Sequence, residues 1–301
     1  MKLALMYGRA NPPLAKTVAQ VLEVEPVKCR IESFPDDEIH VQISETVRGG
    51  DVFIFQPVNP PVAHNLLELM LMADAARRDG AFRITAVVPY LGYARQDRRV
   101  SPGEAVGARV IADMIHSKFD RLITVDLHEQ SLEGFFSIPV EHLSAVSLLA
   151  ETLQKNLPEN PVLVAPDLGA SKLVNKYAEI LDLPVVYLYK VRKSGKEVSV
   201  RNIVGEVKGF SPILVDDMIS TGGTMVKGVE ALLSKQCRTD VILVASHGLF
   251  VGRELDRLSE LPVNRIIVTD SISQQNRSLN FSLEVAGLQE MIADTIIRLH
   301  E

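Results

Sequence analysis

Short apolar runs alternate with helical patterns along most of the chain. Runs rich in Val, Ile and Leu predict strands buried on both faces, whereas apolar residues every three or four positions predict amphipathic helices. The predicted strands are residues 3–7, 27–31, 39–43, 52–56, 84–89, 122–126, 162–166, 185–189, 213–215, 241–245 and 266–269. The predicted helices are residues 12–22, 62–78, 104–116, 143–153, 168–181, 225–235 and 288–299. Residues 191–201 are charged, contain glycine and predict a mobile loop.

The alternation of strands and helices predicts an α/β fold with doubly wound, mostly parallel sheets. A strand, loop and helix over residues 87–115 are matched in order by a strand, loop and helix over residues 214–233. We therefore expect two similarly folded domains in tandem, over residues 1–142 and 143–301, with the final helix packing back on the first domain.

Composition limits the class of partner. The 301 residues are 47% hydrophobic and 23% charged, which is typical of a globular protein. A formal net charge of -6 argues against nucleic acid or an anionic membrane as the main partner. Cys29 and Cys237 lack metal-binding spacing, and no apolar run reaches membrane-spanning length, so a cytoplasmic location is expected.

The stretch from Ile213 to Thr224 combines a buried strand, two acids and a glycine turn. The strand is predicted to stop at Asp216 and Asp217, and Thr221-Gly222-Gly223-Thr224 then leads into a helix. Glycines let the backbone approach an anion, and amides at a helix start and threonine hydroxyls can donate to it. Carboxylates instead suit sugar hydroxyls or Mg²⁺. The stretch therefore fits a sugar phosphate, although a helix-capping turn beside two solvated acids is the simpler alternative.

A basic loop follows the strand at residues 84–89. It contains Arg95, Gln96 and Asp97, and a guanidinium group binds phosphate oxygens in pairs. Asp126 and His128 end another strand and, in an extended chain, point the same way, so they could share one metal ion. Each stretch alone also fits a solvated loop or a hydrogen bond at a strand end.

Two further stretches repeat these themes in the second half of the chain. Asp167 follows the strand at residues 162–166 and directly precedes a helix. Lys190 and Arg192 place positive charge at the start of the predicted loop, where they could offset negative charge that develops during phosphoryl transfer. Ordinary solvation of a charged loop is the alternative for the second stretch.

Taken in order, these stretches resemble one family. The Asp216 to Thr224 stretch resembles the phosphoribosyl-binding loop of the type I phosphoribosyltransferase fold. The full set resembles ribose-phosphate diphosphokinases, also called phosphoribosyl pyrophosphate synthetases, over nearly the whole chain. It comprises Phe34-Pro35-Asp36-Asp37-Glu38, Tyr93-Ala94-Arg95-Gln96-Asp97, Asp126-Leu127-His128, Pro166-Asp167, Lys190 with Arg192, and Asp216 to Thr224.

The resemblance implies transfer of the diphosphoryl group of ATP to the 1-hydroxyl of ribose 5-phosphate, giving phosphoribosyl pyrophosphate and AMP. It implies two tandem phosphoribosyltransferase-like domains, the first on the ATP side and the second on the ribose 5-phosphate side. It also implies Mg²⁺ and a homo-oligomer, from a dimer up to a hexamer. The Phe34 region would reach the ATP site of a neighbouring subunit.

The resemblance also assigns roles to residues of this chain. Lys190 and Arg192 would be catalytic. Phe34, Asp36, Glu38, Arg95, Gln96 and Asp97 would bind ATP. Asp216, Asp217, Ser220, Thr221, Gly222, Gly223 and Thr224 would bind ribose 5-phosphate. His128, Asp167 and Asp126 would serve magnesium.

Two other functions stay open at this stage. A nucleobase phosphoribosyltransferase shares the acid pair and the Thr-Gly-Gly-Thr loop, but does not need the Arg95–Asp97 or Asp126–His128 stretches. A regulatory homologue without activity would bind nucleotide and control a catalytic partner. The chain also departs from the family at Ser220, where many members carry a third acid.

Overall fold

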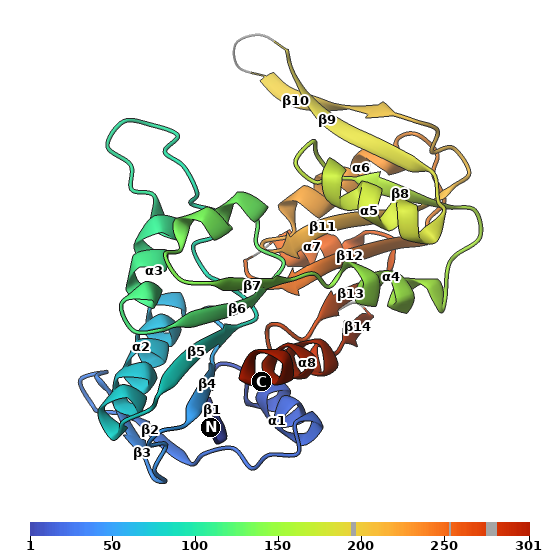
Figure 1. Cartoon of the computed structure of the whole chain (residues 1–301). Coiled ribbons are helices and arrows are strands. Elements are labelled where there is room, and N and C mark those ends of the chain that lie inside the picture. Colours follow the sequence, from blue (N-terminus) through green and yellow to red (C-terminus); the bar gives the residue numbers. More distant parts are fainter. Residues whose placement is uncertain (194–196, 253, 275–281) are drawn as a thin grey trace. The chain divides into compact units, whose positions relative to one another are not determined.

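The chain forms two compact units in the computed structural model, which describes residues 1–193, 197–252, 254–274 and 282–301 (Figure 1). The side chains of residues 190–201 and 254 lie outside this description as well. Unit 1 consists of Met1–Ser144, Ser271–Ser273 and Gly287–Glu301, and unit 2 of Ala145–Asp270 and Gln274–Ala286. No helix among the described residues has the length and apolar character needed to cross a bilayer.

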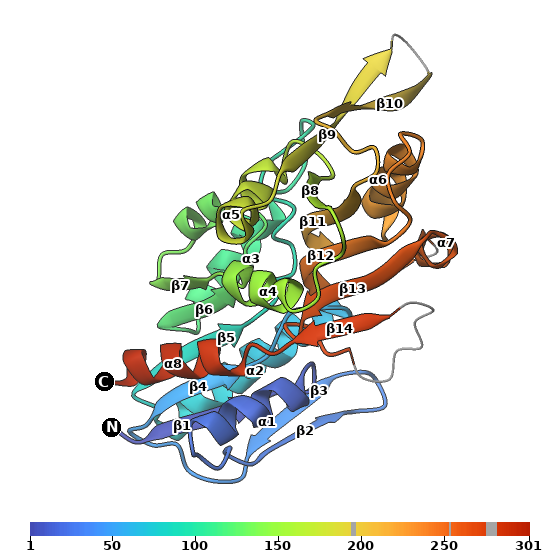
Figure 2. The same cartoon turned by 90° about the vertical axis from the view of Figure 1, so that its right-hand side faces the viewer.

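Unit 1 is built on a parallel sheet with strand order β1-β4-β5-β6-β7 (Figures 1 and 2). These strands are β1 (Leu3–Tyr7), β4 (Asp51–Phe55), β5 (Arg83–Val88), β6 (Arg121–Val125) and β7 (Val140–Leu143). A separate antiparallel pair is formed by β2 (Cys29–Ser33) and β3 (Ile39–Ile43). The helices are α1 (Pro12–Val21), α2 (Val62–Asp79), α3 (Gly107–His116) and α8 (Gln289–His300), with a 3-10 turn, η1 (Gln130–Phe135).

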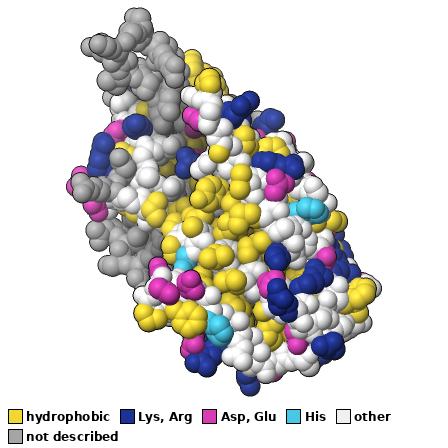
Figure 3. All heavy atoms as spheres, turned by 90° about the vertical axis from the view of Figure 1, so that its left-hand side faces the viewer, with side chains coloured by type: hydrophobic (Ala, Val, Ile, Leu, Met, Phe, Trp, Pro, Cys, Tyr) yellow, Lys and Arg dark blue, Asp and Glu magenta, His cyan; other side chains and the backbone are white. Residues whose placement is uncertain are grey.

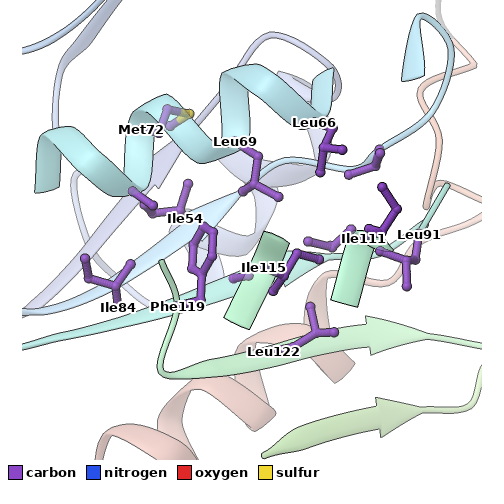
Figure 4. Packing of buried hydrophobic residues seen from close by; sticks show 14 of the residues in the cluster. Ile54, Leu66, Leu69, Met72, Ile84, Leu91, Ile111, Ile115, Phe119 and Leu122 are labelled. Atoms are coloured by element: carbon purple, nitrogen blue, oxygen red, sulfur yellow. The ribbon is translucent and has the colours of Figure 1, made fainter. Parts of the chain in front are cut away.

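The unit 1 sheet is buried on both faces. Alternate strand residues such as Ile54, Ile84 and Leu122 pack against α2 and α3 in one apolar cluster (Figure 4). Phe53 and Phe55, which flank Ile54 in β4, are also buried. They point to the opposite face of the sheet because successive strand side chains alternate. On that face α1 and α8 contact each other (Figure 2). The continuous apolar runs of the sequence reflect this double burial.

Unit 2 has a larger sheet, with strand order β10-β9-β8-β11-β12-β13-β14, in which only the β9–β10 pair is antiparallel among the described residues. Its strands are β8 (Pro161–Ala165), β9 (Val185–Lys193), β10 (Glu197–Val204), β11 (Ser211–Ile219), β12 (Val241–Gly248), β13 (Val263–Thr269) and β14 (Leu283–Ala286). Its helices are α4 (Val146–Gln154), α5 (Ser171–Leu181), α6 (Gly223–Leu233) and α7 (Glu254–Glu260). The α/β architecture with mostly parallel sheets confirms the predicted fold class.

The prediction of a mobile loop at residues 191–201 is wrong for the described part of that stretch. Residues 191–193 continue β9 and residues 197–201 begin β10, with Val200 opposite Val191 and Arg201 opposite Lys190. Val198 and Val200 alternate with polar residues, a period-2 pattern that favours a strand. Residues 194–196 of this prediction lie outside the described residues.

Predicted helix boundaries also differ from the structure, and α5, for example, begins at Ser171 and not at residue 168. The helix expected from residue 104 begins at Gly107, because Glu104 instead accepts hydrogen bonds from the amides of Val100 and Ser101, at 2.7 and 3.0 Å. The helix expected over residues 143–153 is preceded by a short edge strand, since β7 takes residues 140–143 and α4 starts only at Val146.

The last helix is fastened to the amino-terminal edge of the unit 1 sheet. Asp51, at the start of β4, has a fully buried side chain that pairs with Arg83 and accepts a hydrogen bond from His300 Nδ1 at 2.9 Å. Arg83 and Arg121 both donate to the backbone carbonyl of Leu299, at 2.9 and 3.0 Å. One buried carboxylate and two arginines thus hold the carboxyl end of α8.

We expect Asp51→Asn to lower the free energy of unfolding by about 3 kcal/mol near neutral pH, because it leaves Arg83 without its buried counter-charge. Burial raises the pKa of Asp51, but hydrogen bonds from Arg83 and His300 and the charge of Arg83 outweigh it, so the pKa is lowered overall. A lowered pKa stabilises the fold above the unfolded pKa of about 3.9, and this contribution is lost as the pH falls through the folded value. Urea unfolding followed by circular dichroism measures the free energy of unfolding. The difference between Asp51→Asn and the wild type should become smaller below about pH 4.

The matched control is Asp74→Asn, which breaks a half-exposed pairing with Arg78 and Lys118 on the same unit. Its effect should be much smaller, because solvent screens exposed ion pairs. Equal losses in the two variants would contradict the special role of Asp51.

Candidate active site

The acid pair lies inside β11 and not beyond its end, which corrects the predicted strand boundary. The strand continues to Ile219 because β12 pairs with it along this length, with Asp216 opposite Ala245 and Ile219 opposite Gly248. The pairing with β8 on the other side stops at Leu214. Asp216 and Asp217 therefore follow the last residue paired with β8, at the carboxyl half of the strand, and both are half-buried.

Asp167 belongs to the same group of acids in unit 2. It follows β8, the strand next to β11, so both chain segments emerge at the same edge of the parallel sheet. Asp167 Oδ1 accepts hydrogen bonds from the amides of Gly169 and Ala170, at 2.9 and 3.2 Å, just before α5. Burial raises the pKa of Asp216 well above its ordinary value, and the nearby carboxylates of Asp217 and Asp167 add to the rise. Three carboxylates thus gather where a cation or a set of sugar hydroxyls would relieve their repulsion.

The Thr221–Thr224 turn has the geometry expected of an anion cradle. Gly222 has φ +86°, a left-handed conformation that favours glycine, and it caps α6, which begins at Gly223. The amides of the first helical turn lack partners within the helix, and the helix dipole adds positive potential there. Thr221 and Thr224 are exposed on either side of the two glycines.

A supporting segment that the sequence did not reveal lies behind this turn. The amides of Leu249 and Phe250 donate to the carbonyl of Ile219, at 3.0 and 3.1 Å, and the amide of Val251 donates to that of Ser220 at 2.9 Å. These bonds tie the chain after β12 to the start of the turn. Phe250 has φ +47°, an uncommon conformation for a bulky residue, which the paired backbone maintains.

Lys190 and Arg192 can be placed only by their backbone. Both lie in β9, and their side chains are outside the described residues. Their expected catalytic role is therefore carried by the sequence alone.

In unit 1, Arg95, Gln96 and Asp97 lie in the turn after β5. The side chains of Arg95 and Gln96 are exposed and that of Asp97 is half-buried. The carbonyl of Gln96 accepts from the amide of Ala108 at 3.1 Å, which ties the turn to α3. At Gly107 an added Cβ would lie 2.5 Å from Gln96 Oε1, so the Gln96 side chain packs close to the start of α3.

Asp126 and His128 lie at the neighbouring strand end, after β6. The strands β5 and β6 are adjacent and parallel, so their following loops share one edge of the sheet. Asp126 has φ +36°, and its amide donates to the carbonyl of Leu143 at 2.9 Å. Among the described residues, no group of three or more His, Cys, Asp or Glu side chains is arranged as a metal site.

The third unit 1 segment, Phe34 to Glu38, forms the turn between β2 and β3. The amide of Phe34 donates to the carbonyl of Glu38 at 2.8 Å, and the amide of Glu38 donates to Asp36 Oδ1 at 3.4 Å. Phe34, Asp36 and Glu38 are all exposed, and 49% of the Phe34 surface is accessible. An aromatic ring and two acids are thus presented outward on a tight turn.

Comparison with known proteins accounts for this combination. Residues 3–118 match the model of the N-terminal domain of ribose phosphate pyrophosphokinase, and residues 141–283 match the phosphoribosyl transferase domain. The chain belongs to the ribose-phosphate pyrophosphokinase family. Its relatives of that name include proteins from Caldanaerobacter subterraneus, 38% identical over 99% of this chain and 95% of the relative, and Thermotoga maritima, 38% identical over 100% and 96%. The crystal structure of phosphoribosylpyrophosphate synthetase from Mycobacterium smegmatis matches with 35% identity and a TM-score of 0.91, covering 99% of both chains.

Membership of the pyrophosphokinase family confirms the resemblance predicted from the ordered motifs. The match extends over both units, so it covers the unit 1 loops as well as the unit 2 phosphate-type turn. The acid pair and the glycine turn alone would have left a phosphoribosyltransferase equally open.

We expect Asp216→Asn to stabilise the unliganded protein near neutral pH by roughly 1 kcal/mol while lowering its activity. A raised pKa means that the ionised carboxylate destabilises the fold, so stability falls as the pH rises above the unfolded value of about 3.9. Asparagine removes that charge and keeps a similar shape. Thermal unfolding at several pH values should give the variant a higher Tm than the wild type at neutral pH and an equal Tm near pH 4. A less stable variant at neutral pH would show that Asp216 is ionised and well paired.

Proposed function

We propose that this chain is a ribose-phosphate pyrophosphokinase that transfers the diphosphoryl group of ATP to the 1-hydroxyl of ribose 5-phosphate. The products are phosphoribosyl pyrophosphate and AMP. The observation that carries the proposal is the acid pair of β11 followed by the Gly222 turn, in a chain matched end to end by relatives of that name. This combination supports a sugar-phosphate site in the setting of a diphosphotransferase.

In the proposed reaction, unit 2 holds ribose 5-phosphate. The 5-phosphate lies against the amides of Gly222 and Gly223 and the hydroxyls of Thr221 and Thr224, with Ser220 beside them. Asp216 and Asp217 accept hydrogen bonds from the ribose hydroxyls, which are neutral donors and relieve the repulsion between the acids. The sugar is thus held at both ends, which orients its 1-hydroxyl.

Unit 1 supplies the ATP-binding residues in this proposal. Arg95 and Gln96 lie along the phosphates and ribose of ATP, with Asp97 next to them. Phe34, Asp36 and Glu38 meet the adenine of a neighbouring subunit. Support comes from the exposure of Phe34, Asp36, Glu38, Arg95 and Gln96, which leaves these side chains accessible to a ligand or to another copy of the chain.

Chemistry in this class consists mainly of positioning and charge neutralisation. The 1-hydroxyl oxygen attacks the β-phosphorus in line, the bond from that phosphorus to the α,β-bridging oxygen breaks, and AMP leaves. Lys190 and Arg192 stabilise the negative charge that spreads over the transferred group. The hydroxyl proton is released without a named general base.

Magnesium is the proposed cofactor, with Asp126 and His128 as its ligands on unit 1 and Asp167 as its ligand on unit 2. The donor chemistry of unit 2 fits a cation, because burial and then the nearby carboxylates of Asp217 and Asp167 raise the pKa of Asp216. Magnesium in nucleotide enzymes is commonly bound by one or two carboxylates together with substrate phosphates and water. When bound, it neutralises phosphate charge and orients the diphosphoryl group.

A homo-oligomer, from a dimer up to a hexamer, is part of the same proposal. Exposed hydrophobic side chains are visible in Figure 3. On unit 1, Leu67, Val110 and Met114 are also exposed, and the last two lie one turn apart on α3. Exposed apolar surface of this kind is typical of protein contacts.

The full-length match argues against the two other functions considered from the sequence. A single-domain nucleobase phosphoribosyltransferase would leave the N-terminal family match over residues 3–118 without a role. A regulatory homologue would be expected to lose the basic residues at the catalytic stretch, yet Lys190 and Arg192 are both present.

The decisive measurement is AMP formation from ATP and Mg²⁺, with and without ribose 5-phosphate. AMP should appear only when the sugar phosphate is present, and Lys190→Ala should lower kcat by roughly 100-fold while ATP binding persists. Lys176→Ala, on an exposed position of α5, is the matched control and should retain wild-type activity. Nucleotide binding without AMP formation in the wild type would instead support the regulatory function.

We expect EDTA to abolish AMP formation and added Mg²⁺ to restore it, because removing the cation leaves the phosphate charge without its metal counter-charge. The Asp167→Asn variant should need about 10-fold more Mg²⁺ for half-maximal activity. Unchanged Mg²⁺ dependence in this variant would remove Asp167 from the proposed metal site.

A further inference from the structure

The turn after β6 is held in an unusual conformation by hydrogen bonds that two of its backbone amides donate. Asp126 has φ +36°, which costs free energy for a residue with a side chain. Its amide donates to Leu143 O, and the next amide, that of Leu127, donates to His142 Nε2, both at 2.9 Å. Both acceptors belong to the last two residues of β7, which pairs in register with β6. The conformation of the turn therefore depends on β7.

The bond to Leu127 fixes the tautomer of His142. A backbone N–H can only donate, so Nε2 must be the accepting nitrogen and carries no hydrogen. In the neutral ring the hydrogen is then on Nδ1, which lies 2.7 Å from Glu133 Oε1 and donates to that carboxylate. The His142 side chain is only 16% exposed, so this orientation is shielded from solvent. Glu133 thus selects the form of His142 that can accept the amide of Leu127.

Leu127, at the centre of the turn, is anchored by both its side chain and its amide. Its side chain is buried in the unit 1 core with Leu132, and its amide is bound by His142. The residues on either side of it are Asp126 and His128. Anchoring Leu127 at two points therefore restricts the directions in which both flanking side chains leave the backbone.

We propose that His142, oriented by Glu133, is a positioning residue for Asp126 and His128 and, through them, for the magnesium-bound phosphates of ATP. The inference rests on the proposed function, in which Asp126 and His128 serve magnesium. Magnesium demands near-ideal octahedral geometry, so small rotations of its ligands weaken binding. Outer residues that orient metal ligands commonly affect metal affinity 10- to 100-fold.

The test compares His142→Gln with His142→Leu. Glutamine can accept from Leu127 through its carbonyl oxygen and donate to Glu133 through its amide, whereas leucine can do neither. We expect His142→Leu to raise the Mg²⁺ concentration for half-maximal AMP formation about 10-fold, and His142→Gln to stay within about 3-fold of wild type. Glu133→Ala should also raise the Mg²⁺ concentration for half-maximal AMP formation, by a smaller factor. This variant provides a second test if His142→Leu does not fold.

The matched control is Arg109→Ala. Arg109 NH1 donates to the carbonyl of Phe135 at 3.1 Å, so this variant loosens the same segment without touching the Asp126–His128 turn. Its Mg²⁺ dependence should equal that of wild type. An equal shift in Arg109→Ala and His142→Leu would overturn the inference, because general loosening would then explain both.

A binding readout separates this inference from the proposed function. Calorimetric titration with Mg²⁺ and α,β-methylene-ATP, whose α,β bridge cannot be cleaved, measures affinity without turnover. Weaker binding in His142→Leu and near wild-type binding in His142→Gln would support the positioning role. Equal affinity in wild type and His142→Leu would overturn it, whereas absence of AMP formation by the wild type would overturn only the proposed function.

Discussion

Burial of both faces of a parallel sheet restricts where this protein can place polar chemistry. Side chains along the strands are committed to packing against helices, as Ile54 and Phe53 illustrate from opposite faces of β4. Charged groups are more readily placed near strand ends, which the helices cover less, and in parallel sheets the carboxyl ends all lie at one edge. Asp126 and Asp167 follow strands at such edges, and the acid pair of β11 lies where its pairing with β8 has already ended. In each unit, the residues of the catalytic proposal named here therefore lie toward the carboxyl ends of strands.

The same constraint explains why the sequence predicted the fold and the family so well. Apolar runs that stop at polar clusters mark buried strands and their ends together, so Thr221–Thr224 and Arg95–Asp97 could be found without coordinates. The Gly222 turn was recognisable because the left-handed conformation it adopts favours glycine.

Features that depend on contacts between distant residues could not be predicted in this way. Asp51 directly precedes the predicted strand at residues 52–56, and nothing near it in the sequence indicates that its partners include His300, far along the chain. Glu133 and His142 occur in a mixed stretch without clear periodicity, so neither β7 nor the hydrogen bond to Leu127 was expected. The β9 boundary was missed because the charges of residues 191–201 masked the alternation of the valines at 198 and 200.

The attachment of α8 also has a consequence for how the protein is made. Unit 1 begins at residue 1, but its segment Gly287–Glu301 leaves the ribosome only after the whole of unit 2. Until then α1 lacks the helix it packs against, and Arg83 and Arg121 lack the carbonyl of Leu299. The domain that is translated first is therefore completed last, and the nascent chain carries an uncovered apolar face through most of its synthesis.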